Sequence, residues 1–80
     1  GISQEEAALI AQNTLIEDGF TLSRVNILKP EVYESGLVEG CWAIGFDASL
    51  KVQREQGLKW YLVHIDKKTG EIKSLGWGPS

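Results

Sequence analysis

Three side chains in the C-terminal third are of the types that carry out nucleophilic and acid–base chemistry. His64 is the only histidine, Asp66 follows two residues later, and Ser74 lies in the next apolar run. A Ser–His–acid triad needs the histidine between the nucleophile and a carboxylate that orients the ring. His64 and Asp66 lie two apart on a predicted strand, so they point to the same side without that geometry. We therefore predict no catalytic residues and interpret His64 as a strand histidine at the edge of an apolar face.

Metal and phosphate sites also lack their residue patterns. A zinc site takes three or four cysteine or histidine ligands, and the chain has one of each, Cys41 and His64. Gly76-Trp77-Gly78 lacks the lysine and the following helix of a phosphate-binding loop. The net charge is −3 and the basic residues are scattered, which is not typical of nucleic-acid binding. We expect no metal, no cofactor and no nucleic-acid partner.

The composition is that of one small globular domain, residues 1–80, with 42% hydrophobic and 24% charged residues. No apolar run approaches the length that spans a bilayer, so we expect no membrane insertion. Cys41 lies in an apolar stretch and is predicted to be a buried, inert thiol. The absence of methionine predicts that the chain was cut from a longer one, so the compartment does not follow from the missing signal peptide.

The N-terminal stretch has the pattern of a capped amphipathic helix. Ser3 and Glu6 form a capping box, and Gly19 suits the left-handed stop position, which predicts a helix over residues 4–18. One face carries Ala7, Ile10, Ala11, Thr14 and Leu15. Leu9 and Ile16 fall on another side. We favour packing of that second patch beneath a loop, with an exposed contact surface as the alternative.

The rest of the chain alternates between apolar and polar residues and predicts strands at 20–29, 41–52, 58–66 and 71–77. Residues 30–40 are expected to form a connection with short extended pieces, 51–57 a hairpin loop, and 78–80 a tail. Asp66 and Gly70 are typical of a tight turn between the last two strands. The predicted fold class is α+β, with one N-terminal helix packed on one face of a three- to four-stranded antiparallel sheet.

Alternation also separates two faces of this predicted sheet. The face beneath the helix is expected to hold Val25, Ile27, Trp42, Ile44, Phe46, Ala48, Leu50, Tyr61, Val63 and Ile65. The opposite face is expected to hold a candidate protein-contact surface of Trp60, Leu62, His64, Leu75 and Trp77, beside the small residues of the 41–52 strand. Three kinds of group could cover this surface: the 30–40 connection or a flanking segment, a partner protein or second copy, and, least favoured, a small molecule.

Three segments resemble the PepSY domain: ISQEEAALIA at 2–11, WAIGF at 42–46 and YLVHIDKKTGEI at 61–72. The resemblance implies a cystatin-like or NTF2-like fold of a helix on a sheet. It also implies a bacterial, non-catalytic, extracytoplasmic role, secreted or at the cell envelope, in which the domain inhibits or regulates a peptidase. The layout is also similar to that of some bacterial toxin-immunity proteins, which act in the cytoplasm. A dimerisation or structural module is the third alternative.

Overall fold

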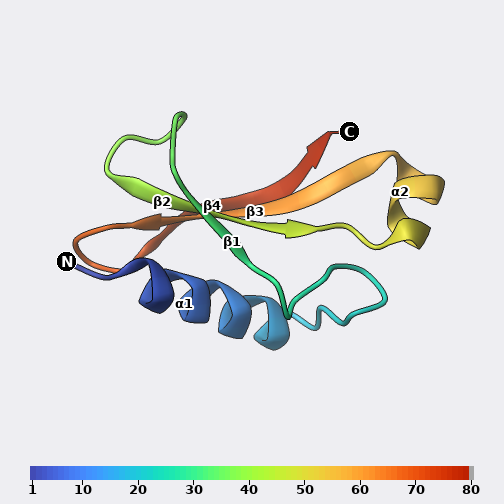
Figure 1. The fold of residues 1–80 in the computed structure, drawn as a ribbon, viewed down its shortest axis with the longest axis horizontal. Coiled ribbons are helices and arrows are strands. Elements are labelled where there is room, and N and C mark those ends of the chain that lie inside the picture. The colour runs from blue at the N-terminus through green and yellow to red at the C-terminus, as the bar shows by residue number, and fades with distance from the viewer. Residues whose placement is uncertain (80) are drawn as a thin grey trace.

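The computed structural model describes residues 1–79, and within them the chain forms two helices and one sheet (Figure 1). The elements are α1 (Gln4–Glu17), β1 (Glu31–Glu34), β2 (Cys41–Asp47), α2 (Leu50–Gln56), β3 (Leu58–Asp66) and β4 (Ile72–Pro79). The four strands pair in chain order, each antiparallel to the next. α1 lies along one face of this sheet (Figure 1), which confirms the predicted α+β fold.

The predicted cap and stop of α1 are both present. The Ser3 hydroxyl accepts a hydrogen bond from the Glu6 amide at 3.1 Å, and the Glu6 carboxylate accepts one from the Ser3 amide at 3.0 Å. These contacts satisfy helix amides that have no partner inside the helix, and they lower the pKa of Glu6 from its ordinary value. The helix ends at Glu17 with Asp18 as its C-cap, and Gly19 follows with a φ of 86°, in the left-handed region that favours glycine.

One face of α1 is buried and another is open to solvent. Ala7, Ala11 and Leu15 are fully buried against the sheet, as predicted. Leu9 and Ile16 are 58% and 57% exposed, so the expectation that they pack beneath a loop is wrong. The loop that follows α1 leaves this side of the helix uncovered.

Residues 20–29 form turns, so the strand predicted there is wrong. Within residues 1–79 one isolated bridge joins this segment to the end of β2, between Val25 and Ala48. The Asn26 amide donates to the carbonyl of Asp47 and the Ser49 amide to that of Arg24, whereas the Val25 amide donates to the carbonyl of Thr21 in the turn. Val25 and Ile27 are nevertheless buried, as expected.

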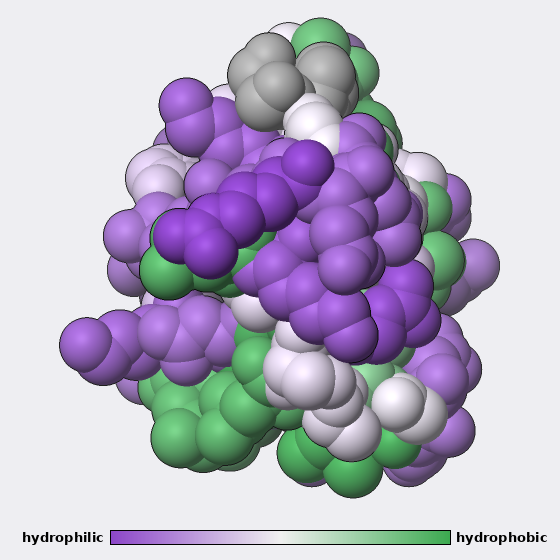
Figure 2. All heavy atoms as spheres, turned by 90° about the vertical axis from the view of Figure 1, so that its right-hand side faces the viewer, coloured by the Kyte–Doolittle hydropathy of each residue, from purple (hydrophilic) through white to green (hydrophobic). Residues whose placement is uncertain are grey.

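Seen from the end that carries α2, the surface is mostly hydrophilic, with hydrophobic surface gathered in its lower part (Figure 2).

The predicted strand 41–52 is too long, and the predicted hairpin loop 51–57 is wrong, because residues 50–56 form the helix α2. β2 ends at Asp47, and the Ser49 hydroxyl then caps α2 by accepting from the Val52 amide. Gly57, at φ 67°, ends the helix in the left-handed region. Leu50, expected in the core, is 67% exposed, and Val52 is buried in its place. A local cap and stop around good helix formers therefore override the strand alternation.

The turn between β3 and β4 has the predicted chemistry. The Asp66 carboxylate accepts from the amides of Lys68 and Thr69 at 2.8 and 3.0 Å. Gly70 has a φ of 76°, and its Cα faces the side chains of α1 and the N-terminal segment. β4 then extends past Trp77 to Pro79, so most of the predicted tail is strand. Ser80, its last residue, lies outside the described residues.

An aromatic cluster closes the core at the far end of α1. Phe20, Tyr61 and Trp77 have ring centroids 4.7 to 6.0 Å apart. The Arg24 guanidinium lies 4.9 Å from the centre of the Phe20 ring and 5.5 Å from that of Trp77. Burial raises the pKa of Tyr61. The segment 20–29 thus contributes to the core mainly through side chains, and its pairing with the sheet is limited to the Val25–Ala48 bridge.

Candidate functional site

The sheet face that lies away from α1, called the open face below, is set by the strand register. Gly45 of β2 pairs with Glu31 of β1 and with Leu62 of β3, so these three side chains point to the same side. Tyr33 and Trp60 share this side through their pairs with Ala43 and Asp47. On β4 the open face carries Ser74, Gly76 and Gly78.

Two residues of the predicted contact surface lie on the sheet face beneath α1 and not on the open face. Leu75 pairs with Val63, and Trp77 pairs with Tyr61, which places both on the face beneath α1. The cause is a register shift between His64 and Ile65, which puts one extra residue into the β4 side of the ladder. A shift of one residue moves every later side chain of a strand to the other face. Trp60, Leu62 and His64 do lie together on the open face, as predicted.

The open face is buried at one end and accessible at the other. Cys41, Ala43 and His64 are only 2%, 8% and 8% exposed although α1 lies on the other side of the sheet. The loop between β1 and β2 rises on this side, next to the start of β2 (Figure 1). At the other end, Trp60 and Tyr33 are 40% and 52% exposed.

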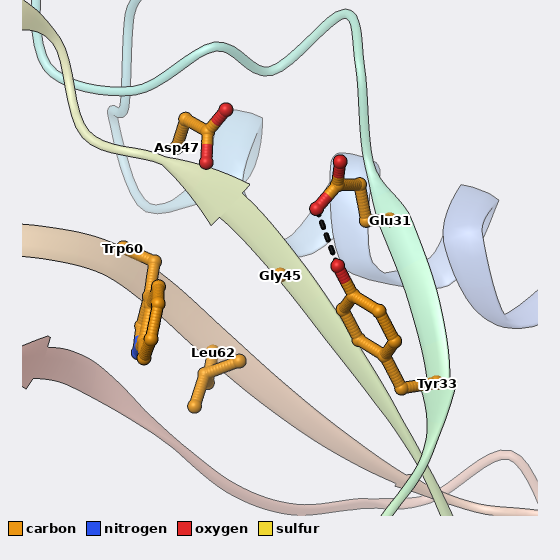
Figure 3. A pocket seen from close by; sticks show the side chains of 6 residues that line it. All are labelled: Glu31, Tyr33, Gly45, Asp47, Trp60 and Leu62. Atoms are coloured by element: carbon orange, nitrogen blue, oxygen red, sulfur yellow. Dashed lines mark hydrogen bonds between the residues drawn. The ribbon is translucent and has the colours of Figure 1, made fainter.

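A hollow of about 290 Å³ occupies the accessible end. Figure 3 shows its construction: β1 forms one side, β3 the other, and Gly45 of β2 lies between them. It is lined by Glu31, Tyr33, Gly45, Asp47, Trp60 and Leu62, and we call it the aromatic slot. Its walls are largely apolar, and its two carboxylates lie at the end of β2 and on β1 (Figure 3).

Glycines make room for the aromatic side chains of this slot. A Cβ on Gly45 would lie 3.5 Å from the side chain of Leu62 and 3.8 Å from the Tyr33 ring. A Cβ on Gly78 would lie 1.9 Å from Nε1 of Trp60, so the indole rests directly on the Gly78 backbone. Coverage of a strand glycine by a cross-strand aromatic ring is a known way to stabilise such a position. The Trp60 indole is therefore held against the backbone of β4, and it forms one wall of the aromatic slot.

The electrostatics of the slot are negative. The Tyr33 hydroxyl donates a hydrogen bond to the Glu31 carboxylate. This bond, together with partial burial and the negative charges of Glu31 and Asp47, raises the pKa of Tyr33 above its ordinary value. Among residues 1–79 neither carboxylate has an ion-pair partner, and no lysine or arginine lines the slot.

His64 and Ser74 meet at the other end of the open face. Ser74 Oγ lies 3.0 Å from His64 Nδ1, within hydrogen-bond distance. The carboxylate of Asp66, the third member of the triad considered from the sequence, instead accepts from the turn amides of Lys68 and Thr69. Within residues 1–79 no group of three or more histidine, cysteine, aspartate or glutamate side chains is placed to hold a metal ion. Neither helix in this part of the chain has the length and apolarity to cross a bilayer.

No family model, curated protein or solved structure matches the chain. The resemblance to the PepSY domain therefore stays a prediction from the three sequence segments.

Sequence reasoning missed the β1 wall of the slot. Residues 30–40 were expected to form a connection with short extended pieces. Glu31–Glu34 is such a piece, but it pairs with β2 as a strand of the sheet, and its alternation places Glu31 and Tyr33 on the open face. The signal was the Glu-Val-Tyr-Glu alternation itself, which is too short to predict a strand without its partner. Gly45 and Asp47 lie on the side of β2 away from the core, since they alternate with the buried Ile44 and Phe46.

Proposed function

We propose that this chain is a non-catalytic protein-binding domain whose contact surface is the accessible end of the open face. The supporting observation is the aromatic slot, where Trp60 and Tyr33 are both half exposed and both held in place by neighbouring groups. Tryptophan, tyrosine and arginine are the side chains that most often dominate the energy of protein interfaces. An aromatic pair around a glycine floor is the kind of surface that a partner protein covers.

The size of the slot favours a protein over a small molecule. Its volume of about 290 Å³ lies at the lower limit of ligand pockets, which span roughly 300–1,000 Å³. A slot of this size accepts one side chain, and the remaining binding area must come from the strands around it. A second copy of the chain is the other occupant that such an apolar face suits.

The partner class in this proposal is a peptidase or another cell-envelope enzyme, which the domain inhibits by covering its surface. This step rests on the resemblance of residues 2–11, 42–46 and 61–72 to the PepSY domain, which also makes the role extracytoplasmic. The open face supplies the contact surface that such inhibition requires.

Titration of the chain into a thermolysin-type metallopeptidase, with casein hydrolysis as the readout, tests this function. The wild type is expected to inhibit, and Tyr33→Ser with Trp60→Ser to weaken inhibition by about tenfold or more. The matched control is Leu9→Ser with Ile16→Ser, which removes exposed apolar residues from the outer side of α1. Circular dichroism checks that all variants are folded. Absence of inhibition by the wild type, or equal loss in both double variants, contradicts the proposal.

Sedimentation velocity tests the second copy as the occupant. If the open face joins two copies, the wild type sediments as a dimer and Trp60→Ser as a monomer. Monomers in both samples exclude self-association through this face.

A further inference from the structure

We propose that the aromatic slot receives an arginine side chain of the partner protein. The inference rests on the proposed function, since it names the chemistry by which the partner is recognised. It is carried by the pairing of two fixed aromatic walls with two carboxylates at one hollow.

The aromatic walls are already in place before a ligand arrives. Trp60 rests on the backbone of Gly78, and Tyr33 is tied to Glu31 through its hydroxyl. A side chain that is held in its bound position loses little conformational entropy when a partner binds. The slot therefore has the preorganisation of a recognition site.

Three other aromatic rings of this fold have a cation of the chain beside them. Arg24 lies over Phe20 and Trp77, and the Lys67 ammonium lies 4.4 Å from the centre of the Trp42 ring. Within residues 1–79 no lysine or arginine lies over Tyr33 or Trp60. Cations are attracted to aromatic faces by about 0.5–1 kcal/mol at exposed sites, so a cation from outside the chain suits these two rings.

The carboxylates of Glu31 and Asp47 also favour a cationic side chain in the slot. Glu31 and Asp47 line the slot without an ion-pair partner in the described chain. A neutral apolar side chain would fill the slot but would cover part of both carboxylates without compensating their charge. A cationic side chain fills the slot and compensates that charge.

Arginine fits this arrangement better than lysine. Its guanidinium is planar, so one face stacks on an aromatic ring while its N–H groups donate to carboxylates that lie in the guanidinium's own plane. A lysine ammonium is a compact, strongly hydrated charge that does not offer both contacts with one flat surface. The apolar stem of arginine can lie along Leu62 and the Gly45 floor.

NMR titration with three short peptides tests the inference directly. The probes are Ac-Gly-Arg-Gly-NH₂, the same peptide with citrulline, which keeps the shape and removes the charge, and the same peptide with lysine, which keeps the charge and removes the planar group. We expect the Trp60 indole and Gly45 amide signals to shift with the arginine peptide, with affinity about fivefold or more above that for citrulline. Equal affinity for the arginine and citrulline peptides overturns the inference, and so does a lysine peptide that binds as tightly as the arginine peptide.

Two double variants separate the slot from general charge effects. Glu31→Gln with Asp47→Asn is expected to reduce arginine-peptide affinity to the citrulline level. Glu17→Gln with Glu55→Gln removes the same charge at exposed helix positions and is expected to leave affinity unchanged. Equal losses in both variants show an effect of net charge alone and overturn the inference.

The outcomes are separable from those of the peptidase assay. If Tyr33→Ser with Trp60→Ser abolishes inhibition but none of the peptides shifts the slot signals, the proposed function stands and the arginine inference fails. If the arginine peptide binds and no peptidase is inhibited, the slot chemistry stands and the partner class is wrong.

Discussion

The sheet face beneath α1 is filled by large side chains, whereas the open face has small residues along the inner strand β2. Beneath the helix, β2 presents Ile44 and Phe46, both fully buried. On the other side the same strand presents Cys41, Ala43 and Gly45. The bulk on the open face comes from the neighbouring strands, through Tyr33 on β1 and Trp60 and Leu62 on β3.

This difference shows how a sheet without a second helix layer can still have a structured outer face. Tyr33 and Leu62 lie over Gly45 of β2, whereas the Trp60 indole lies against Gly78 of β4, and a hollow remains between the side chains of β1 and β3. The covered face gains stability from close packing, because packed apolar area is the main stabilising term. The open face retains exposed aromatic area, which is available for binding.

The largest expected difference between the faces is in the cost of losing an aromatic ring. Phe46→Ala removes a fully buried ring and is expected to lower the free energy of unfolding by about 3–5 kcal/mol. Trp60→Ser removes a ring that is 40% exposed and is expected to cost about 1 kcal/mol. Urea denaturation measures both, and equal costs would show that Trp60 belongs to the core.

The support of the Trp60 wall can be tested at the two β4 glycines. In Gly78→Ala the new methyl group would collide with the indole, so we expect a loss of about 1–3 kcal/mol and a displaced ring. Gly76→Ala places its methyl in open space and is expected to stay within about 0.5 kcal/mol of the wild type. Urea denaturation and the Trp60 indole NMR signal compare the two. A stable Gly78→Ala protein with an unchanged indole signal contradicts the close packing.

The turn beside α1 is expected to be sensitive to a branched side chain. Gly70→Val forces a β-branched residue to a φ of 76°, and its Cβ would lie 3.4 Å from Ile10, so we expect a loss of about 1–3 kcal/mol. Gly36→Val is the control, since Gly36 lies in open space without a positive φ. Thermal denaturation should rank the two, and an unchanged melting temperature for Gly70→Val would rule out strain at this turn.

The smallest expected effect is the acid sensitivity of the same turn. Hydrogen bonds from the Thr69 and Lys68 amides hold the pKa of Asp66 below its ordinary value of 3.8. The folded state therefore binds the proton less readily than the unfolded state, so this stabilisation is present above pH 3.8 and is lost as pH falls through the folded pKa. Asp66→Asn is expected to flatten the acid limb of stability against pH. A wild-type slope in this variant would assign the limb to other carboxyls.

Prediction from the sequence was most successful where the signals are local. The capping box of Ser3 and Glu6 and the turn at Asp66 follow from side chains close to the backbone groups that they satisfy. The full extent of β3 follows from its alternation of apolar residues. Alternation failed at residues 50–56, where a cap at Ser49 and a stop at Gly57 form a helix instead. It also failed for the aromatic slot, whose β1 wall is a strand too short to show in the sequence.

The sequence by itself determined the helix on an antiparallel sheet, because caps, glycine turns and apolar alternation act over a few residues. Only the tertiary structure decided which side of the sheet Trp77 occupies and which rings surround the slot. The pairing register with β3 decides to which face each side chain of β4 points. One extra residue of β4 opposite His64 and Ile65 places Trp77 on the face beneath α1, in the aromatic cluster. Trp60 and Tyr33 remain to form the slot, since their strands lie on opposite sides of Gly45.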